Sequence, residues 1–200
     1  MKKIIIASGN KGKIAEFKAL FEKENIKILS LADLPVEIPE IEETGVTFHE
    51  NAQIKAETVA KTLNLPVIAD DSGLVVDALD GEPGVYSARY AGEPVNDHNN
   101  NEKLLNAMNH LKESERSARF VAVLALARPG EKTIYFEGHC EGKIALQAAG
   151  EFGFGYDPIF IPKGYSKTMA QLPQEEKNSI SHRYHALQEV NKWLQSNEVL

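Results

Sequence analysis

Short apolar runs alternate with amphipathic segments along the whole chain. Residues 3–7 and 67–69 are apolar runs of strand length, whereas residues 13–24 and 47–63 repeat apolar side chains at helical spacing. Alternation of this kind is typical of an α/β fold, in which helices cover the faces of a sheet. We therefore expect the chain to open with a strand, a glycine-rich turn and a helix.

The second helix has the clearest start signal in the sequence. Thr47 followed by Glu50 forms a capping box, which predicts that the helix begins just after Thr47. Its apolar stripe consists of Ala52, Ala56, Val59, Ala60 and Leu63. We expect the next strand, residues 67–69, to be short and buried and to stop at Asp70-Asp71-Ser72-Gly73, where the polar residues begin.

The second half of the chain predicts two adjacent strands between two helices. Asp97 is a candidate cap for a third helix that carries Leu104, Leu105, Met108 and Leu111. Residues 119–127 and 133–140 predict an antiparallel pair joined at Pro129-Gly130, so the sheet is expected to be mixed. A further strand is expected at 159–161, and a last helix at 181–195.

Composition narrows the class of protein. The 200 residues are 42% hydrophobic, carry a net charge of −7 and include one cysteine. This length makes one large domain or two small lobes, and no run is long enough to cross a bilayer. An acidic chain argues against polymeric nucleic acid as the main partner, since backbone binding needs a basic surface. Cys140 fits a reducing compartment and is interpreted as an ordinary strand residue, so a cytoplasmic protein is expected.

The turn after the first strand is a candidate anion site, composed of Ser8, Gly9, Asn10, Lys11, Gly12 and Lys13. A turn that opens a helix presents free backbone N–H groups and the positive end of the helix dipole. The sequence is not a Walker A loop, because Ile14 stands where a magnesium-binding hydroxyl should be. A tight strand–helix turn without a ligand is the alternative.

Two acidic pairs are candidates for metal chemistry. Adjacent carboxylates such as Asp70 and Asp71 repel each other, and Mg²⁺ commonly takes one or two carboxylates beside substrate phosphates. Capping of a turn is the alternative for this pair. Glu42 and Glu43 precede the second helix and could supply another oxygen ligand, or simply interact with its dipole.

Two further segments are suited to binding a planar base. Gly153 and Gly155 flank Phe154 and precede Tyr156 and Asp157, so the aromatic ring can lie against a ligand; a hairpin or bulge is the alternative. A second set consists of Lys177, Ser181, His182 and Arg183, which could donate hydrogen bonds to a purine edge or form a polar helix face. His182 and His185 lack a third soft ligand, so a zinc site is not favoured.

Taken in order, these motifs resemble the inosine triphosphate pyrophosphatases, a family also described as non-canonical purine NTP pyrophosphatases. The matching runs cover residues 8–13, 42–48 with 50–52, 69–74, 84–90, 153–160 and 179–183. Ser8 replaces the commoner threonine and keeps the hydroxyl. The resemblance implies an α/β fold with an elongated mixed sheet flanked by helices, and one domain of two lobes over residues 1–200 with the active-site cleft between them. It also implies a homodimer.

The resemblance also implies site roles. Residues 8–13 would hold the triphosphate, Glu42 and Asp71 would hold Mg²⁺, and Asp71 would also be the proton acceptor. The nucleotide would be contacted by Ser72, Phe154, Gly155, Tyr156, Asp157, Lys177, His182 and Arg183. The implied reaction is hydrolysis of ITP, dITP or XTP to the monophosphate and pyrophosphate, which removes these nucleotides from the pool. The alternatives are a phosphatase or Maf-like pyrophosphatase, and a nucleotide-sensing protein without turnover.

Overall fold

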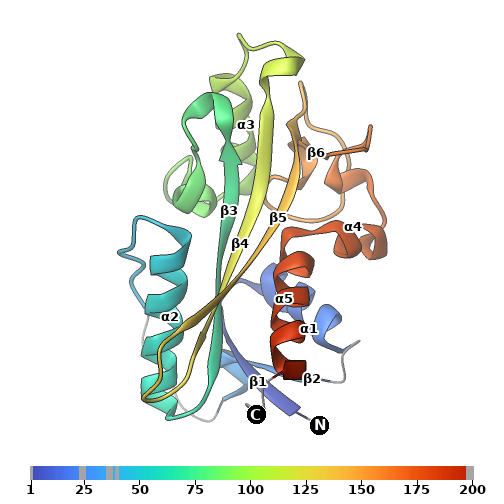
Figure 1. Ribbon diagram of the computed structural model, residues 1–200. Helices are drawn as coiled ribbons and strands as arrows, with labels where there is room; N and C mark the ends of the chain where they lie inside the picture. Colours follow the sequence, from blue (N-terminus) through green and yellow to red (C-terminus); the bar gives the residue numbers. More distant parts are fainter. Residues whose placement is uncertain (1, 23–25, 35–37, 39–40, 197–200) are drawn as a thin grey trace. The chain divides into compact units, whose positions relative to one another are not determined.

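The computed structural model describes residues 2–22, 26–34, 38 and 41–196 (Figure 1). Within them, six strands form one sheet in the order β2-β1-β3-β4-β5-β6. The strands are β1 (Lys2–Ala7), β2 (Ile26–Ser30), β3 (Val67–Val76), β4 (Ser117–Ala127), β5 (Ile134–Ile144) and β6 (Phe160–Pro162). β1 is parallel to β2 and β3, whereas β5 and β6 are antiparallel, so the predicted mixed sheet is confirmed.

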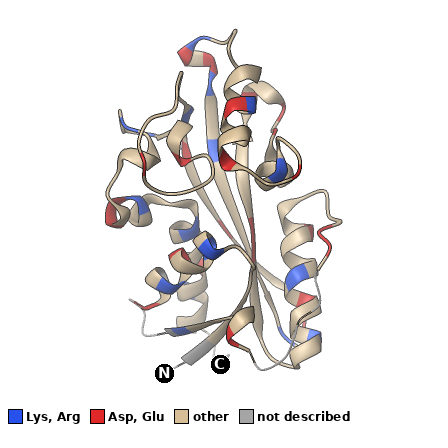
Figure 2. Ribbon diagram, turned by 180° about the vertical axis from the view of Figure 1, so that it is seen from behind, with Lys and Arg blue, Asp and Glu red and all other residues tan. Residues whose placement is uncertain are grey.

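Five α-helices accompany the sheet in the described part of the chain. They are α1 (Lys11–Glu22), α2 (Phe48–Leu63), α3 (Asp97–Ala107), α4 (Gln174–Ile180) and α5 (His182–Ser196). None of the described helices is long and apolar enough to cross a membrane. Acidic and basic residues are interspersed along the helices and loops, while the strands carry few charges (Figure 2).

The chain divides into two compact units. Unit 1 contains residues 1–71, 122–138 and 183–200, and unit 2 contains residues 72–121 and 139–182. In unit 1, α1 and α5 cover one face of the sheet and α2 covers the other (Figure 1). The core on the α1–α5 face joins Phe17, Phe21, Leu187 and Val190 of these helices to Ile6 and Ile68 of the strands.

The second helix starts where the sequence predicts. Thr47 Oγ1 accepts a hydrogen bond from the Glu50 N–H, and the Glu50 carboxylate accepts from the Thr47 N–H, which is the expected capping box. The predicted stripe is buried at Ala52, Ala56, Val59 and Ala60. α2 is therefore fixed against the sheet by a small-residue face that allows close approach.

The third strand differs from the prediction. β3 does not stop at Asp70 but runs on through Asp71 to Val76 as one ten-residue strand. The pairing of β3 with β1 ends at Ala7 and Ala69. The two aspartates therefore lie just beyond the end of β1, in the middle of β3. Successive side chains of a strand point to opposite faces. Asp70 therefore follows Ile68 toward α1 and α5, and Asp71 points toward α2.

Unit 2 has its own core, and the start of α3 corrects one prediction. Leu74 and Val76 pack with Leu104 of α3, with Met108 just after this helix and with Phe160 of β6. The N-cap of α3 is Asn96 rather than Asp97, because the Asn96 side chain accepts from the Asn99 N–H. The last helix, predicted at 181–195, is α5 and begins at His182, so this prediction is confirmed, whereas the sequence did not predict α4, which ends at Ile180 just before the extended Ser181.

Candidate active site

The loop between β1 and α1 is shaped by its own polar side chains. Asn10 Oδ1 accepts from the Lys13 N–H at 3.1 Å, and Ser8 Oγ accepts from the Asn10 N–H at 3.2 Å. α1 begins at Lys11, two residues earlier than predicted, so Lys11 and Lys13 lie in its first turn. A Cβ placed on Gly9 would have no heavy atom within 4 Å. The backbone at Gly9 is therefore open to close approach by a ligand.

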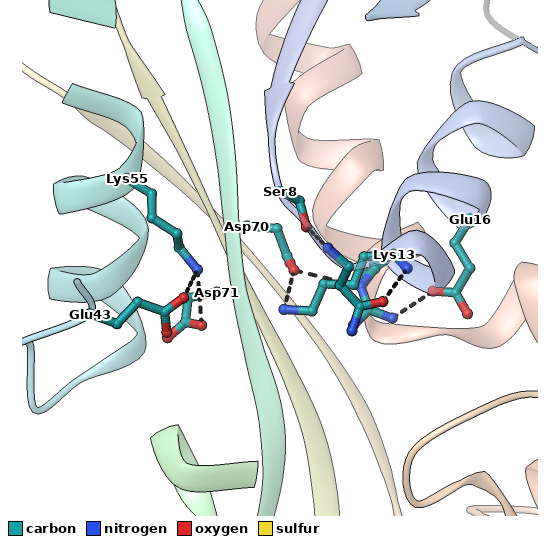
Figure 3. A network of polar contacts seen from close by, with 9 residues as sticks. Ser8, Lys13, Glu16, Glu43, Lys55, Asp70 and Asp71 are labelled. Atoms are coloured by element: carbon teal, nitrogen blue, oxygen red, sulfur yellow. Dashed lines mark hydrogen bonds and ion pairs between the residues drawn. The ribbon is translucent and has the colours of Figure 1, made fainter. Parts of the chain in front are cut away.

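Asp70 binds cations from two helices on the α1–α5 face (Figure 3). Its Oδ2 lies 2.7 Å from Lys13 Nζ of α1 and 3.8 Å from Arg183 Nε of α5, and its side chain is 0% exposed. Arg183 also pairs with Glu16 of α1, at 2.5 Å. Burial alone would raise the pKa of Asp70, but Lys13 and Arg183 lower it well below its usual value. Asp70 is therefore a fixed carboxylate at neutral pH.

Asp71 lies in a different cluster on the α2 face (Figure 3). Lys55 Nζ of α2 donates to Asp71 Oδ1 at 3.3 Å and to Glu43 Oε1 at 3.0 Å. Burial raises the pKa of Asp71, and the opposing attraction of Lys55 and Lys13 does not cancel this effect. Burial alone would lower the pKa of Lys55, yet Asp71, Glu43 and Asp70 raise it. Lys55 therefore stays charged beside two carboxylates.

The Asp71 cluster is compatible with the predicted magnesium site. Asp71 Oδ2 is buried and makes no hydrogen bond to any residue that the structure describes. The formal charges of Lys55, Asp71 and Glu43 sum to −1, and oxygen donors are the ligands that Mg²⁺ prefers. No group of three His, Cys, Asp or Glu suited to a metal occurs among the described residues. Mg²⁺ does not need one, because it often keeps waters and substrate oxygens in its coordination shell.

Glu42 and Glu43 separate in the structure. Glu43 is half-buried and pairs with Lys55, whereas Glu42 is exposed, and its carboxylate makes no hydrogen bond within the described part of the chain. Because Glu43 pairs with Lys55, Glu42 is the carboxylate of this loop that is available to bind a metal ion. The metal pair Glu42 and Asp71 stays a prediction.

The glycine-flanked aromatic loop of unit 2 is held by one carboxylate. Asp157 Oδ2 accepts from the Phe154 N–H at 2.9 Å and lies 2.7 Å from Lys177 Nζ. The side chains of Asp157 and Lys177 are both buried, at 7% and 5% exposed, and Lys177 Nζ lies 4.9 Å from the centre of the Phe154 ring. A Cβ on Gly153 would lie 2.1 Å from Asp157 Oδ2, so this position requires glycine. The loop therefore joins Phe154, Asp157 and Lys177 into one cluster.

The remaining predicted nucleotide contacts have distinct environments. The Tyr156 ring belongs to the core of unit 2 and its hydroxyl donates to the Ser87 carbonyl at 2.7 Å, so only its backbone is suited to a ligand. Ser72 is half-buried in β3. His182 is buried and stacks on Phe120, with ring centres 4.9 Å apart and planes at 13°. Arg183 belongs to the Asp70 cluster of unit 1.

Three residues of these clusters were not among the predicted site residues: Glu16, Lys55 and Phe120. Lys55 lies between Ala52 and Val59 on the apolar stripe of α2. A lysine on the buried face of an amphipathic helix is uncommon without a partner, so this position was a usable signal. Glu16 lies beside Phe17 on the inward face of α1 and could have been found in the same way. Phe120 resembles any other apolar strand residue, and nothing in the sequence distinguishes it.

Comparison with known proteins identifies the family. The model of the Ham1 family matches residues 4–193. The chain belongs to the Ham1 family. A curated relative from Oceanobacillus iheyensis, named dITP/XTP pyrophosphatase, is 57% identical over 194 residues, which cover 97% of this chain and 98% of the relative.

Solved Ham1 structures agree with the fold. The Ham1 protein of Coxiella burnetii has a TM-score of 0.88 at 43% identity and covers 98% of this chain and 100% of its own. The Ham1 protein of Staphylococcus aureus has a TM-score of 0.86 at 48% identity, with 98% and 99% covered. The expected family, α/β class and helix-flanked mixed sheet are thereby confirmed.

Proposed function

We propose that this chain hydrolyses dITP, ITP and XTP to the nucleoside monophosphate and pyrophosphate, with Mg²⁺ as cofactor. The observation that carries the proposal is the similarity, over nearly the full length of both chains, to relatives named dITP/XTP pyrophosphatase. The three polar clusters described above supply the groups that such a reaction needs. An enzyme of this kind removes non-canonical purine nucleotides from the nucleotide pool.

The triphosphate is assigned to the loop and first helical turn formed by Ser8, Gly9, Asn10, Lys11, Gly12 and Lys13. The open backbone at Gly9 and the N-terminus of α1 support this assignment, because both present N–H groups to an anion. Lys13 is already oriented by Asp70, so its ammonium is held in place before substrate arrives. A held cation loses less side-chain entropy on binding a phosphate oxygen than a free one.

The metal is assigned to Asp71 and Glu42, with Asp71 also as the group that accepts a proton from the attacking water. When bound, Mg²⁺ would neutralise charge on the phosphates and so favour their cleavage. Burial supports the second role, because it makes the Asp71 carboxylate a better proton acceptor than an exposed aspartate. Lys55 keeps Asp71 and Glu43 in place by donating to both.

The base is assigned to Phe154, Gly155, Tyr156 and Asp157 with Lys177, His182, Arg183 and Ser72. An aromatic ring beside a buried lysine can stack a purine and offer a donor to its edge. Donors that read a purine O6 would face the amino group of adenine, and an unpaired buried polar group costs about 1–3 kcal/mol. This cost corresponds to roughly 10- to 100-fold discrimination against ATP.

The proposal also includes the assembly: one domain of two lobes, present as a homodimer. Light scattering of the purified protein coupled to size-exclusion chromatography tests this part, since it gives the mass directly. A mass of one chain at micromolar concentration would contradict the dimer and leave the activity untouched.

The activity is tested by incubating purified protein and Mg²⁺ with ITP, XTP, ATP or GTP and resolving pyrophosphate from orthophosphate. We expect pyrophosphate with ITP and XTP, and at least tenfold slower release with ATP. Orthophosphate as the first product would indicate a phosphatase instead. ITP binding without turnover by both the wild type and Asp71→Asn would indicate a nucleotide-sensing protein.

A further inference from the structure

Gly155 of the proposed base-binding loop is held through both of its backbone polar groups by side chains of α3. Its N–H donates to Asp97 Oδ2 at 2.7 Å, and its carbonyl accepts from Asn101 Nδ2 at 3.0 Å. All three residues belong to unit 2. Because α3 is more than fifty positions away in sequence, these bonds are tertiary contacts and not part of the turn itself.

The spacing on α3 makes this a two-point attachment. Asp97 and Asn101 are four residues apart, so their side chains lie one above the other on the same face of the helix. Asn101 is buried and Asp97 is exposed. Gly155 has a φ of +61°, and a Cβ there would meet no heavy atom within 4 Å. Its glycine is therefore required by the backbone conformation, which the two α3 side chains hold.

The two attachments act on a loop that is otherwise fixed from inside. Asp157 holds the Phe154 N–H and Lys177, and Tyr156 is anchored through its hydroxyl to the Ser87 carbonyl. Gly155 lies between Phe154 and Tyr156 and has no side chain of its own to pack. None of these contacts involves the N–H or the carbonyl of Gly155, and both of these groups bind side chains of α3 instead.

We propose that Asp97 and Asn101 are positioning residues that hold the Gly155 backbone, and through it the Phe154 ring, in the conformation that receives the purine base. This inference rests on the proposed function, because it assigns a role to residues outside the set that would touch substrate. It concerns recognition of the base only. Phosphate binding, which the proposed function assigns to unit 1, should not depend on these two side chains.

The experiment compares ITP, which carries a purine base, with inorganic tripolyphosphate, which has no base. KM and kcat are measured for ITP, together with the inhibition constant of inorganic tripolyphosphate, in the wild type, Asn101→Leu and Asp97→Ala. Loss of one positioning hydrogen bond should raise KM for ITP roughly tenfold. We expect kcat to stay within about threefold and the tripolyphosphate constant within about twofold. The preference for ITP over ATP should narrow in the same variants.

Two further variants serve as controls. Asp97→Asn keeps an acceptor oxygen for the Gly155 N–H, so its KM for ITP should lie close to that of the wild type. Asn99→Ala changes an exposed residue of the same helix and should match the wild type. Leucine fits the volume of Asn101, whose Oδ1 makes no hydrogen bond to a described residue, so the fold should tolerate it. If Asn101→Leu nevertheless unfolds, Asp97→Ala alone tests the proposal, because Asp97 is exposed and its replacement should not unfold the protein.

The outcomes separate the two proposals. An active wild type with unchanged KM for ITP in both variants would overturn the positioning role alone. An equal rise in KM for ITP and in the tripolyphosphate constant would also overturn it, since that result indicates general damage. A wild type that neither binds nor hydrolyses ITP would overturn the proposed function and this inference together.

Discussion

Asp70 and Asp71 are consecutive residues of β3 whose carboxylates lie on opposite faces of the sheet and bind different lysines. Asp70 Oδ2 is 2.7 Å from Lys13 Nζ, whereas Asp71 Oδ1 is 3.3 Å from Lys55 Nζ (Figure 3). The Asp70 cluster, with Lys13, Arg183 and Glu16, is formally neutral. The Asp71 cluster carries an excess negative charge. Asp70 is thus suited to holding Lys13 and Arg183 in place, and Asp71 is suited to binding an additional cation.

The first prediction concerns the stability that Asp70 provides. Asp70→Asn leaves the partly buried Lys13 and the buried Arg183 beside a neutral amide, so we expect the free energy of unfolding to fall by about 3 kcal/mol. Urea unfolding followed by circular dichroism measures this change. Asp77→Asn is the matched control, because Asp77 pairs with Arg119 at an exposed site and should cost less than about 1 kcal/mol. Equal effects of the two substitutions would contradict the prediction.

The second prediction is that Asp71→Asn separates stability from activity. Because burial raises the folded-state pKa of Asp71 above its value in the unfolded chain, ionisation at pH 7 opposes folding at this position. Removing the charge should leave the free energy of unfolding unchanged or up to about 1 kcal/mol higher, and Lys55 retains Glu43. Turnover of ITP should fall at least about 100-fold. A variant that is both active and destabilised would contradict this assignment.

The third prediction distinguishes the two glutamates of the loop before α2. If Glu42 is a metal ligand, Glu42→Gln should raise the Mg²⁺ concentration for half-maximal activity by about tenfold. Glu43→Gln removes one partner of Lys55 but no metal ligand, so its Mg²⁺ dependence should resemble the wild type. Initial rates at saturating ITP over a Mg²⁺ titration make the comparison. The reverse pattern would identify Glu43 as the ligand.

The fourth prediction concerns the thiol of Cys140. Burial in β5, with Glu141 and Asp157 nearby, raises the pKa of Cys140 to about 12. The thiolate is the reactive form, so the native protein should not react with iodoacetamide at pH 8.5 within an hour. The urea-unfolded chain should react within minutes, as mass spectrometry of the intact protein can show. Rapid labelling of the native protein would contradict this burial.

Local signals in the sequence predicted the start of α2 better than the end of β3. The Thr47 capping box and the small-residue stripe of α2 were correct because both depend on neighbours within one or two helical turns. The end of β3 was wrong, since polar residues usually stop a buried strand. The cations that allow Asp70 and Asp71 to continue it come from α1, α2 and α5, and no local pattern shows those distant partners.

The site was predictable in its residues more than in its connections. The motifs identified Lys13, Asp70, Asp71, Lys177 and Arg183, but not which of them would pair. Asn96 and Asp97 are both good caps, so only the backbone geometry at Asn96 decides between them. The sequence did not predict α4, a helix of seven residues that ends where the backbone of Ser181 becomes extended, at φ −70° and ψ 152°.

Because Ala69 pairs with Ala7, the number of residues between this pair and each aspartate decides which face of the sheet its carboxylate lies on. A loop in this protein can change length without altering which way any strand residue points. One residue inserted between Ala69 and Asp70 would reverse the faces of the two carboxylates, turning Asp70 toward α2 and Asp71 toward α1 and α5. Directed evolution of this enzyme therefore has to insert or delete residues of β3 in pairs if each carboxylate is to keep its face of the sheet.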